Sequence, residues 1–424
     1  MVISYNTDLA DRNTFGMRVK AACVVEYDSI GDLAEIRGLL SPDGVMPGTV
    51  QYGDTAGSQE RAGRKLPAPV LHIGGGSNLL FTKDFPGTIL HSRIKFIRAE
   101  DDVTANAEAV HQESDPRRGH CPAGQEQAMG DREILVEVGA GTTFDDFCAW
   151  AAEKGLWGVE NLSHIPGETG AAAVQNIGAY GAEIKDVIDK VHCYDMVLGR
   201  TVSFTAGECG YGYRDSLFKR DRKGRYIVTS VTFRLSAEPE PVLGYGHIRS
   251  AVESALRRHS SPAGKHCKPD AGTGQAEHSI YDEAFPGLTP AIIRETITEI
   301  RKEKLPEPDE TGSAGSFFKN PVVPKSDYDR VASIAALYLG EGCTVPHYDA
   351  GSGFVKIPAA WLIEQCGWKG YREGNVGVYD RQPLVIINAT GKATPDEVIA
   401  LEDKIVSSVH SRFGITLTPE VEHI

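Results

Sequence analysis

Apolar runs and alternating apolar and polar positions predict strands along most of the chain. A short apolar run, such as 70–73, is typical of a buried strand, and the alternation over 226–235 is typical of a strand covered on one face. These two patterns predict strands at 21–27, 70–73, 88–91, 134–138, 187–196, 201–205, 226–235 and 383–388.

Capping residues and prolines predict where helices begin. Ser29, with Asp32 three residues later, and Thr143, with Asp146 three residues later, both match the pattern of a helix N-cap. Pro290 suits the first turn of a long helix, where a missing N–H group costs nothing. We expect helices at 29–40, 143–154, 290–304, 328–339, 359–366 and 395–413. Strands and helices together predict the α+β fold class.

Three segments rich in polar residues, Gly and Pro interrupt this pattern. They lie at about 45–66, 100–132 and 259–281, and we interpret each as an insertion. The pattern of elements also changes near residue 240. We therefore predict two domains, 1–240 and 241–424.

Composition and charge narrow the class of protein. The 424 residues include 41% hydrophobic and 24% charged residues, as in an ordinary soluble globular protein. The net charge of −14 argues against a general nucleic-acid or anionic-membrane binder, because those partners require a basic face. No apolar run is long enough to span a bilayer, and the N-terminus lacks the pattern of a signal peptide. The eight Cys form no CxxC pair, so we expect reduced thiols and a cytoplasmic location.

Two stretches rich in small residues are the best candidates for a ligand site. One is LHIGGGSNLLF at 71–81, and the other, at 163–181, is crowded with Gly and Ala. Small residues let the backbone approach a ligand, and consecutive N–H groups can form a nest for an anion. One such stretch alone is better interpreted as a tightly packed turn, and the first does not match the GxGxxG dinucleotide fingerprint. Two of them, each after apolar sequence, suggest one shared phosphate-bearing ligand.

Several polar residues allow both a structural and a functional interpretation. Arg214 forms either a structural ion pair or an anion clamp, and its local sequence favours a structural pair with Asp215 or a nearby acid. Ser316 lies among small residues before two Phe, which fits either a turn or a hydroxyl held beside a dry pocket. Considered alone, Glu420 is best interpreted as a solvated residue and Lys304 as an exposed cation at a helix end.

Other polar residues lie in or beside the glycine-rich stretches. Gln175 and Asn176 carry amides that could hydrogen-bond to a heteroaromatic ring. We interpret His72 and His164 as packing or backbone-bonding residues. The chain contains no HExxH motif, so we expect no metal site.

Several short motifs, spread over nearly the whole chain, occur in the same order in one known family. Together they resemble the UDP-N-acetylmuramate dehydrogenases, also called UDP-N-acetylenolpyruvoylglucosamine reductases. The motifs are NTFG (13–16), GGGSNL (74–79), ENL (160–162), IPG (165–167), QNIGAYG (175–181), GYRDS (212–216), KLP (304–306), AGSFFKNP (314–321), AWLIE (360–364) and PEV (419–421).

The resemblance implies a particular architecture and reaction. It implies a two-lobed FAD-binding domain of the vanillyl-alcohol-oxidase (PCMH) type, with lobes at about 1–92 and 93–240, and a C-terminal α+β substrate domain at 241–424. FAD would bind non-covalently, and NADPH would donate the hydride. The implied substrate is UDP-N-acetylglucosamine enolpyruvate, and the implied product is UDP-N-acetylmuramate, a peptidoglycan precursor.

The resemblance also implies roles for individual residues. Arg214 and Glu420 correspond to the pair that stabilises an enolate, and Ser316 corresponds to the proton donor. Three residues are implied to bind the substrate, namely Tyr245, Lys304 and Asn320. Those implied to bind FAD are Gly74, Gly75, Gly76, Ser77, Asn78, Leu79, Ile165, Pro166, Ala171, Val174, Gly178 and Ile227.

Two other functions remain as alternatives. One is a flavin oxidase that passes electrons to oxygen, and the other is a non-catalytic nucleotide-binding relative. Many such oxidases tether the flavin through a His in the glycine loop, where this chain has Gly-Gly-Gly-Ser-Asn. The chain also carries Arg214, Ser316 and Glu420 at the three catalytic positions of the family, which favours the reductase. A monomer is favoured, and neither nucleic acid nor a membrane is expected as a partner.

Overall fold

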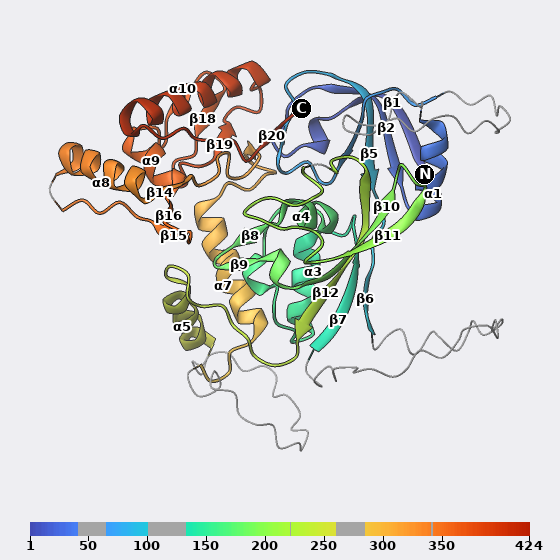
Figure 1. Ribbon diagram of the computed structural model, residues 1–424, viewed down its shortest axis with the longest axis horizontal. Coiled ribbons are helices and arrows are strands. Elements are labelled where there is room, and N and C mark those ends of the chain that lie inside the picture. Colours follow the sequence, from blue (N-terminus) through green and yellow to red (C-terminus); the bar gives the residue numbers. More distant parts are fainter. Residues whose placement is uncertain (41–64, 101–132, 221, 260–284, 341) are drawn as a thin grey trace.

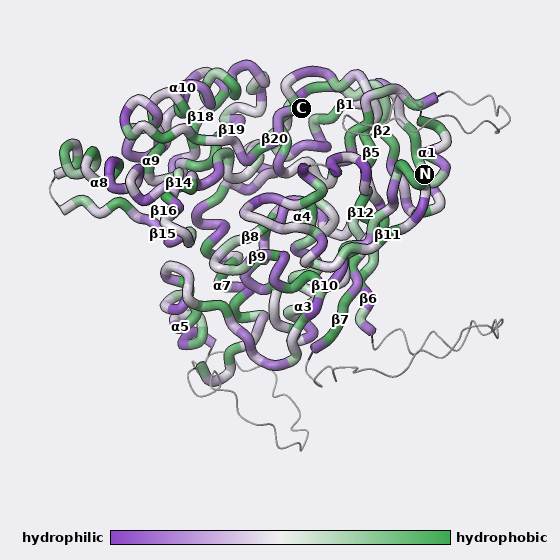
Figure 2. Tube along the Cα trace, viewed as in Figure 1, coloured by the Kyte–Doolittle hydropathy of each residue, from purple (hydrophilic) through white to green (hydrophobic). Residues whose placement is uncertain are grey.

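The computed structural model describes residues 1–40, 65–100, 133–220, 222–259, 285–340 and 342–424 (Figure 1). The three predicted insertions fall almost entirely outside these ranges. Many hydrophobic residues lie within the strands β5 (Phe85–Ser92), β7 (Glu133–Gly139) and β12 (Tyr226–Ser236), whereas no described helix is hydrophobic along its whole length (Figure 2). Accordingly, no helix within the described ranges is long and apolar enough to cross a membrane.

The first sheet has four strands in the order β1-β2-β5-β3. They are β1 (Val2–Asp8), β2 (Lys20–Tyr27), β5 (Phe85–Ser92) and β3 (Val70–Ile73), with helix α1 (Ile30–Leu39) after β2. The predicted N-cap Ser29 accepts a hydrogen bond from the backbone of Asp32 at 3.2 Å. The edge strand β1 was not predicted, because its side chains are mostly exposed and its sequence carries no clear apolar alternation.

The second sheet is antiparallel, with five strands in the order β11-β10-β12-β7-β6. They are β6 (Ile97–Ala99), β7 (Glu133–Gly139), β10 (Ile188–Asp195), β11 (Arg200–Thr205) and β12 (Tyr226–Ser236). Helix α3 (Phe144–Glu153) packs on this sheet, with the rings of Phe147 and Phe233 4.7 Å apart. Thr143 occupies the N-cap position of α3, as predicted, but its side chain makes no capping hydrogen bond, and its backbone forms a bridge with Glu168.

The stretch 163–181, for which the sequence predicted no helix, is in part a helix. Helix α4 (Thr169–Gln175) is followed by a small hairpin of β8 (Gly178–Ala179) and β9 (Ala182–Glu183). A Cβ atom on Gly170 would lie 2.9 Å from the Cβ of Ala140, so α4 approaches the second sheet more closely than larger residues would allow. The small residues of this stretch therefore allow close helix–sheet packing, in addition to any role in ligand binding.

Two helices connect the N-terminal sheets to the C-terminal part. They are α5 (Ile248–His259) and α7 (Pro290–Lys304), and Thr289 caps α7 by accepting a hydrogen bond from Ile292. Both helices share a core with Trp157, which lies in the predicted FAD-binding part. The domain boundary at residue 240 stays a prediction.

The C-terminal part contains two small antiparallel sheets, in the orders β13-β19-β18-β17 and β14-β16-β15. Their strands are β13 (Gly312–Ser313), β14 (Val322–Pro324), β15 (Tyr348–Asp349), β16 (Phe354–Lys356), β17 (Arg372–Glu373), β18 (Val376–Val378) and β19 (Ile386–Asn388). The helices are α8 (Lys325–Leu339), α9 (Ala359–Gln365) and α10 (Pro395–Phe413). Their shared core includes Phe317 and Phe318, which directly follow Ser316.

A last pair of strands joins distant parts of the chain. The strand β20 (Glu422–His423) pairs in parallel with β4 (Leu79–Leu80), which lies within the first glycine-rich stretch, directly after its glycines, Ser77 and Asn78. Figure 1 shows β20 extending from the C-terminal part toward the first sheet. This pairing brings Glu420 to the glycine-rich stretches.

Glu160, just before the second glycine-rich stretch, is buried, and burial raises its pKa from 4.5 to about 6. Between these values the folded chain keeps a proton that the unfolded chain has lost, so the free energy of unfolding falls as pH rises through this window. Replacing Glu160 with Gln keeps an acceptor for the Gly158 N–H, which lies 2.6 Å from the carboxylate. We expect Glu160→Gln to be more stable than wild type by about 2 kcal/mol at pH 8, and equal to it near pH 4.

Denaturant unfolding of both proteins at the two pH values measures this difference. A stability difference that does not change with pH would contradict the assignment.

Candidate active site

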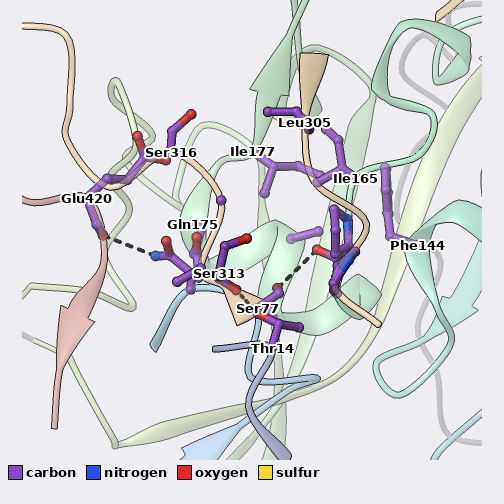
Figure 3. A pocket seen from close by; sticks show the side chains of 18 of the residues that line it. Thr14, Ser77, Phe144, Ile165, Gln175, Ile177, Leu305, Ser313, Ser316 and Glu420 are labelled. Atoms are coloured by element: carbon purple, nitrogen blue, oxygen red, sulfur yellow. Dashed lines mark hydrogen bonds between the residues drawn. The ribbon is translucent and has the colours of Figure 1, made fainter. Parts of the chain in front are cut away.

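A pocket lies where the two glycine-rich stretches meet α7 and the segments that carry Ser316 and Glu420 (Figure 3). Figure 3 shows apolar side chains, including Phe144 and Ile165, at one side of the pocket, and Ser316 and Glu420 at the other, where Arg214 bonds to Glu420. Residues that line it include Thr14, Ser77, Asn78, Phe144, Ile165, Pro166, Glu168, Ala171, Gln175, Ile177, Gly178, Arg301, Leu305 and Ser313.

Arg214 and Glu420 form an ion pair at the polar end. The guanidinium Nε donates to a carboxylate oxygen of Glu420 at 3.0 Å, and both side chains are largely buried. The predicted pairing of Arg214 with Asp215 is wrong, because Asp215 pairs with Arg220 at 3.2 Å. The other possibility in that prediction, a pair with a nearby acid, is confirmed, because Glu420 is close to Arg214 in space although it lies 206 positions away along the chain.

The backbone of the second glycine-rich stretch also holds Arg214. Its guanidinium donates to the carbonyl oxygen of Asn176 at 3.2 Å and to that of Gly178. Arg214 itself has a φ of 54°, a left-handed conformation that costs energy in a residue other than Gly. The guanidinium is therefore fixed at this end of the pocket.

Glu420 is not the solvated residue that its position alone suggested. Its side chain is 15% exposed, and its backbone N–H donates to the carbonyl of Phe317 at 2.8 Å. Its own carbonyl accepts a hydrogen bond from the Asn78 amide at 3.1 Å. Burial raises the pKa of Glu420, while Arg214 and Lys219 act in the opposite direction. The carboxyl therefore holds its proton to higher pH than an exposed Glu.

Ser316 lies in the pocket wall beside Glu420 (Figure 3). It follows Gly315, whose φ of 69° allows the turn before the strand-like segment of Phe317 and Phe318. A β-bridge between Phe318 and Pro419 and the hydrogen bond from the Glu420 N–H to the Phe317 carbonyl fix the position of the Ser316 segment relative to the Glu420 segment. The structure thus brings Arg214, Ser316 and Glu420, the three residues with catalytic roles implied by the resemblance, to one end of one pocket.

The residues predicted to bind FAD divide into two groups. Six line the pocket: Ser77, Asn78, Ile165, Pro166, Ala171 and Gly178. The Ser77 hydroxyl donates to the carbonyl of Pro166 at 3.0 Å, which joins the two glycine-rich stretches directly. The other six do not line it: Gly74, Gly75, Gly76, Leu79, Val174 and Ile227. Of these, Ile227 is buried in a core with Tyr194 and Met196.

The amides of Gln175 and Asn176 have different environments. Gln175 lines the pocket. The Asn176 amide is buried and donates to Gly212 at 2.8 Å, while its oxygen accepts from Lys185 at 3.3 Å. Asn176 therefore supports the turn after α4, and only Gln175 is free to face a ligand. His72 is half-buried and lies 2.7 Å from the Tyr27 hydroxyl, in agreement with its interpretation as a packing residue.

The three predicted substrate residues lie outside the pocket lining. Tyr245 is 39% exposed and stacks on Tyr348, with ring centroids 5.8 Å apart and hydroxyl groups 3.3 Å apart. The Lys304 ammonium lies 3.4 Å from the ring of His247. The Asn320 side chain accepts a hydrogen bond from the backbone of Ala359 at 2.9 Å. The Lys356 ammonium lies 5.6 Å from the centroid of the Tyr348 ring.

Gly76 is required by the backbone of the first stretch. It has a φ of 66°, and a Cβ atom there would lie 2.1 Å from the carbonyl oxygen of Arg12. The adjacent Gly75 has open surroundings, because a Cβ atom there would meet nothing closer than the Cα of Gly167 at 3.7 Å.

We therefore expect Gly76→Ala to destabilise the protein by more than the roughly 1–2 kcal/mol that left-handed backbone alone costs. Gly75→Ala is the matched control and should change stability by less than about 0.5 kcal/mol. Thermal unfolding of the flavin-free proteins measures both effects. Equal losses in the two variants would contradict this assignment.

The comparisons with known proteins agree with this geometry. Residues 127–205 match the family model of an FAD binding domain, and residues 307–424 match the model of the C-terminal domain of UDP-N-acetylenolpyruvoylglucosamine reductase. A UDP-N-acetylenolpyruvoylglucosamine reductase of Bacteroides fragilis is 40% identical over 416 residues, which is 98% of this chain and 98% of that protein. The enzyme of the same name from Chromobacterium violaceum is 36% identical over 98% of this chain and 97% of that protein.

A solved structure shows the same fold. The crystal structure of UDP-N-acetylenolpyruvylglucosamine reductase from Thermus caldophilus has a TM-score of 0.53 at 18% identity, covering 100% of this chain and 98% of that one. The α+β fold class is confirmed. The matched FAD binding domain and the relatives named as reductases place the chain among the FAD-dependent oxidoreductases. More narrowly, it belongs to the UDP-N-acetylenolpyruvoylglucosamine reductase family, as its motifs indicated.

Proposed function

We propose that this chain reduces UDP-N-acetylglucosamine enolpyruvate to UDP-N-acetylmuramate, with FAD as cofactor and NADPH as hydride donor. The observation that carries the proposal is one pocket that joins the two glycine-rich stretches to Arg214, Ser316 and Glu420. Family membership supports the substrate and the cofactor.

The pocket fits a flavin. Its apolar wall, which includes Phe144, Ile165 and Leu305, suits the flat ring system. Glycine at two positions beside the pocket also leaves room for neighbouring protein groups. A Cβ atom on Gly178 would lie 2.9 Å from the Arg214 guanidinium, and one on Gly74 would lie 3.0 Å from the Cβ of Ala171. FAD bound here would supply the hydride carrier between NADPH and the methylene carbon of the enolpyruvyl group.

The protein's own residues stabilise and then protonate the enolate that hydride addition forms. Hydride addition to the methylene carbon moves an electron pair to the adjacent carbon and its carboxylate. Arg214 faces this charge with a fixed guanidinium. Glu420 helps when it is protonated, since a bare carboxylate would repel the enolate, and burial favours its protonated form.

Ser316 then donates its hydroxyl proton to the adjacent carbon, which completes the lactyl ether. Serine is a weak acid, so this step requires a strongly basic carbon at close range. The rigid register between the Ser316 and Glu420 segments supports such positioning. Ser316 recovers its proton from solvent before the next turnover.

The visible spectrum of the purified protein under anaerobic conditions tests the proposal. Flavin absorbance should bleach with NADPH and return when the enolpyruvyl nucleotide is added. Bleached flavin that only air restores would instead indicate an oxidase. A protein that cannot be reconstituted with FAD would overturn the proposal.

A further inference from the structure

A carboxylate inside the pocket has no role in the proposed reaction. Glu168 lines the pocket next to Gly167, and its side chain is only 12% exposed. One oxygen accepts from, or pairs with, the His91 ring nitrogen Nε2 at 2.8 Å. The second oxygen has no hydrogen-bond partner among the described residues, and it lies 3.3 Å from where a Cβ atom on Gly74 would be. It therefore faces the place where the two glycine-rich stretches meet.

His91 fixes the position of the Glu168 carboxylate. The strand β5 carries His91, whose other nitrogen lies 3.6 Å from a carboxylate oxygen of Glu26 on β2. Glu26 in turn pairs with Arg12 at 3.2 Å. Glu26 and His91 lie on strands of the first sheet, and Arg12 ends the 3-10 helix Ala10–Arg12, so the first sheet fixes the direction of the Glu168 carboxylate.

The chemistry of a carboxylate restricts what it can bind. An ionised carboxylate only accepts hydrogen bonds, so it repels phosphate oxygens and suits hydroxyl groups. FAD carries hydroxyl groups on its ribityl chain and on its adenosine ribose, on either side of its pyrophosphate.

We propose that Glu168, oriented by His91, is a further FAD-binding residue that accepts a hydrogen bond from a ribityl or ribose hydroxyl of FAD. The inference rests on the proposed function, because it takes FAD to be the occupant of the pocket. It assigns Glu168 to cofactor binding and His91 to the positioning of Glu168.

The test is a titration of the flavin-free protein with FAD and, separately, with FMN, followed by flavin fluorescence. We expect Glu168→Ala to weaken FAD binding about 10- to 100-fold, as for a hydrogen bond to a charged group. Glu168→Gln should lose less, because its amide oxygen still accepts. If the partner is a ribityl hydroxyl, FMN affinity falls by the same factor, and if it is the ribose hydroxyl, FMN affinity is unchanged.

A matched control is Glu295→Ala. Glu295 also pairs with a histidine, His259, at 3.0 Å, but it is exposed and does not line the pocket. FAD affinity in this variant should stay within about twofold of wild type. His91→Asn should weaken FAD binding in the wild-type background and have no further effect in Glu168→Ala, which separates positioning from general damage.

Unchanged or tighter FAD binding by both Glu168→Ala and Glu168→Gln would overturn the inference. Should Glu168→Ala fail to fold, as judged by thermal unfolding, the nearly isosteric Glu168→Gln decides alone. A wild-type protein that binds no FAD would contradict the proposed function instead, so the two failures are distinguishable.

Discussion

Replacement of Ser316 with Ala is expected to slow reoxidation of the flavin by the enolpyruvyl nucleotide about 10²- to 10⁴-fold, the usual loss when a proton donor is removed. Reduction by NADPH should stay near the wild-type rate, because no proton from Ser316 is needed in that half-reaction. Stopped-flow absorbance measures the two half-reactions separately.

Ser313→Ala is a suitable control for this prediction. Ser313 lines the same pocket three residues earlier, and its backbone carbonyl, which the substitution retains, accepts the hydrogen bond from Thr14. This variant should reoxidise within a few-fold of wild type. Near wild-type reoxidation by Ser316→Ala would remove Ser316 from the mechanism as proton donor.

Removal of the Arg214 guanidinium is expected to have the second large effect. Arg214→Gln takes away the positive charge that faces the enolate, and we expect a loss of about 10²- to 10³-fold in reoxidation. Arg214 also lowers the pKa of Glu420 against the effect of burial, so this pKa should rise further in the variant. The pH profile of reoxidation should therefore shift toward higher pH as well as lower rate.

Arg220→Gln separates this effect from a general loss of positive charge. Arg220 is half exposed and pairs with Asp215, away from the pocket lining. Its removal should leave both the rate and the pH profile unchanged. An equal loss in the two variants would show that Arg214 acts through net charge and not through its place in the pocket.

Sequence pattern predicted the elements whose side chains alternate or are capped. The helices α7 and α10 and the strands β10 and β12 follow directly from apolar periodicity, proline and capping residues. The helix α4 did not, because a run of Gly and Ala has no apolar face to detect. Its helical state depends on close packing against Ala140, which is a tertiary contact.

The site was harder to predict from local sequence than the fold. Local pattern favoured Asp215 as the partner of Arg214 and solvent for Glu420, and the pairing of the two across 206 positions is invisible to any local rule. Only the resemblance to a family brought them together in advance. Glu168 and Arg301 line the pocket yet were missed, since neither a lone Glu before a helix nor an Arg within one carries a signal of its own.

The pairing of β20 with β4 has a consequence for folding. The hydrogen bond from Asn78 to Glu420 and that from Thr82 to Ile424 each close a loop of 342 positions. Closing a longer loop costs little more free energy, since the entropy grows only with the logarithm of length, but contacts this distant along the chain form slowly. During refolding, the sheets and helices should therefore recover before the ability to bind flavin does.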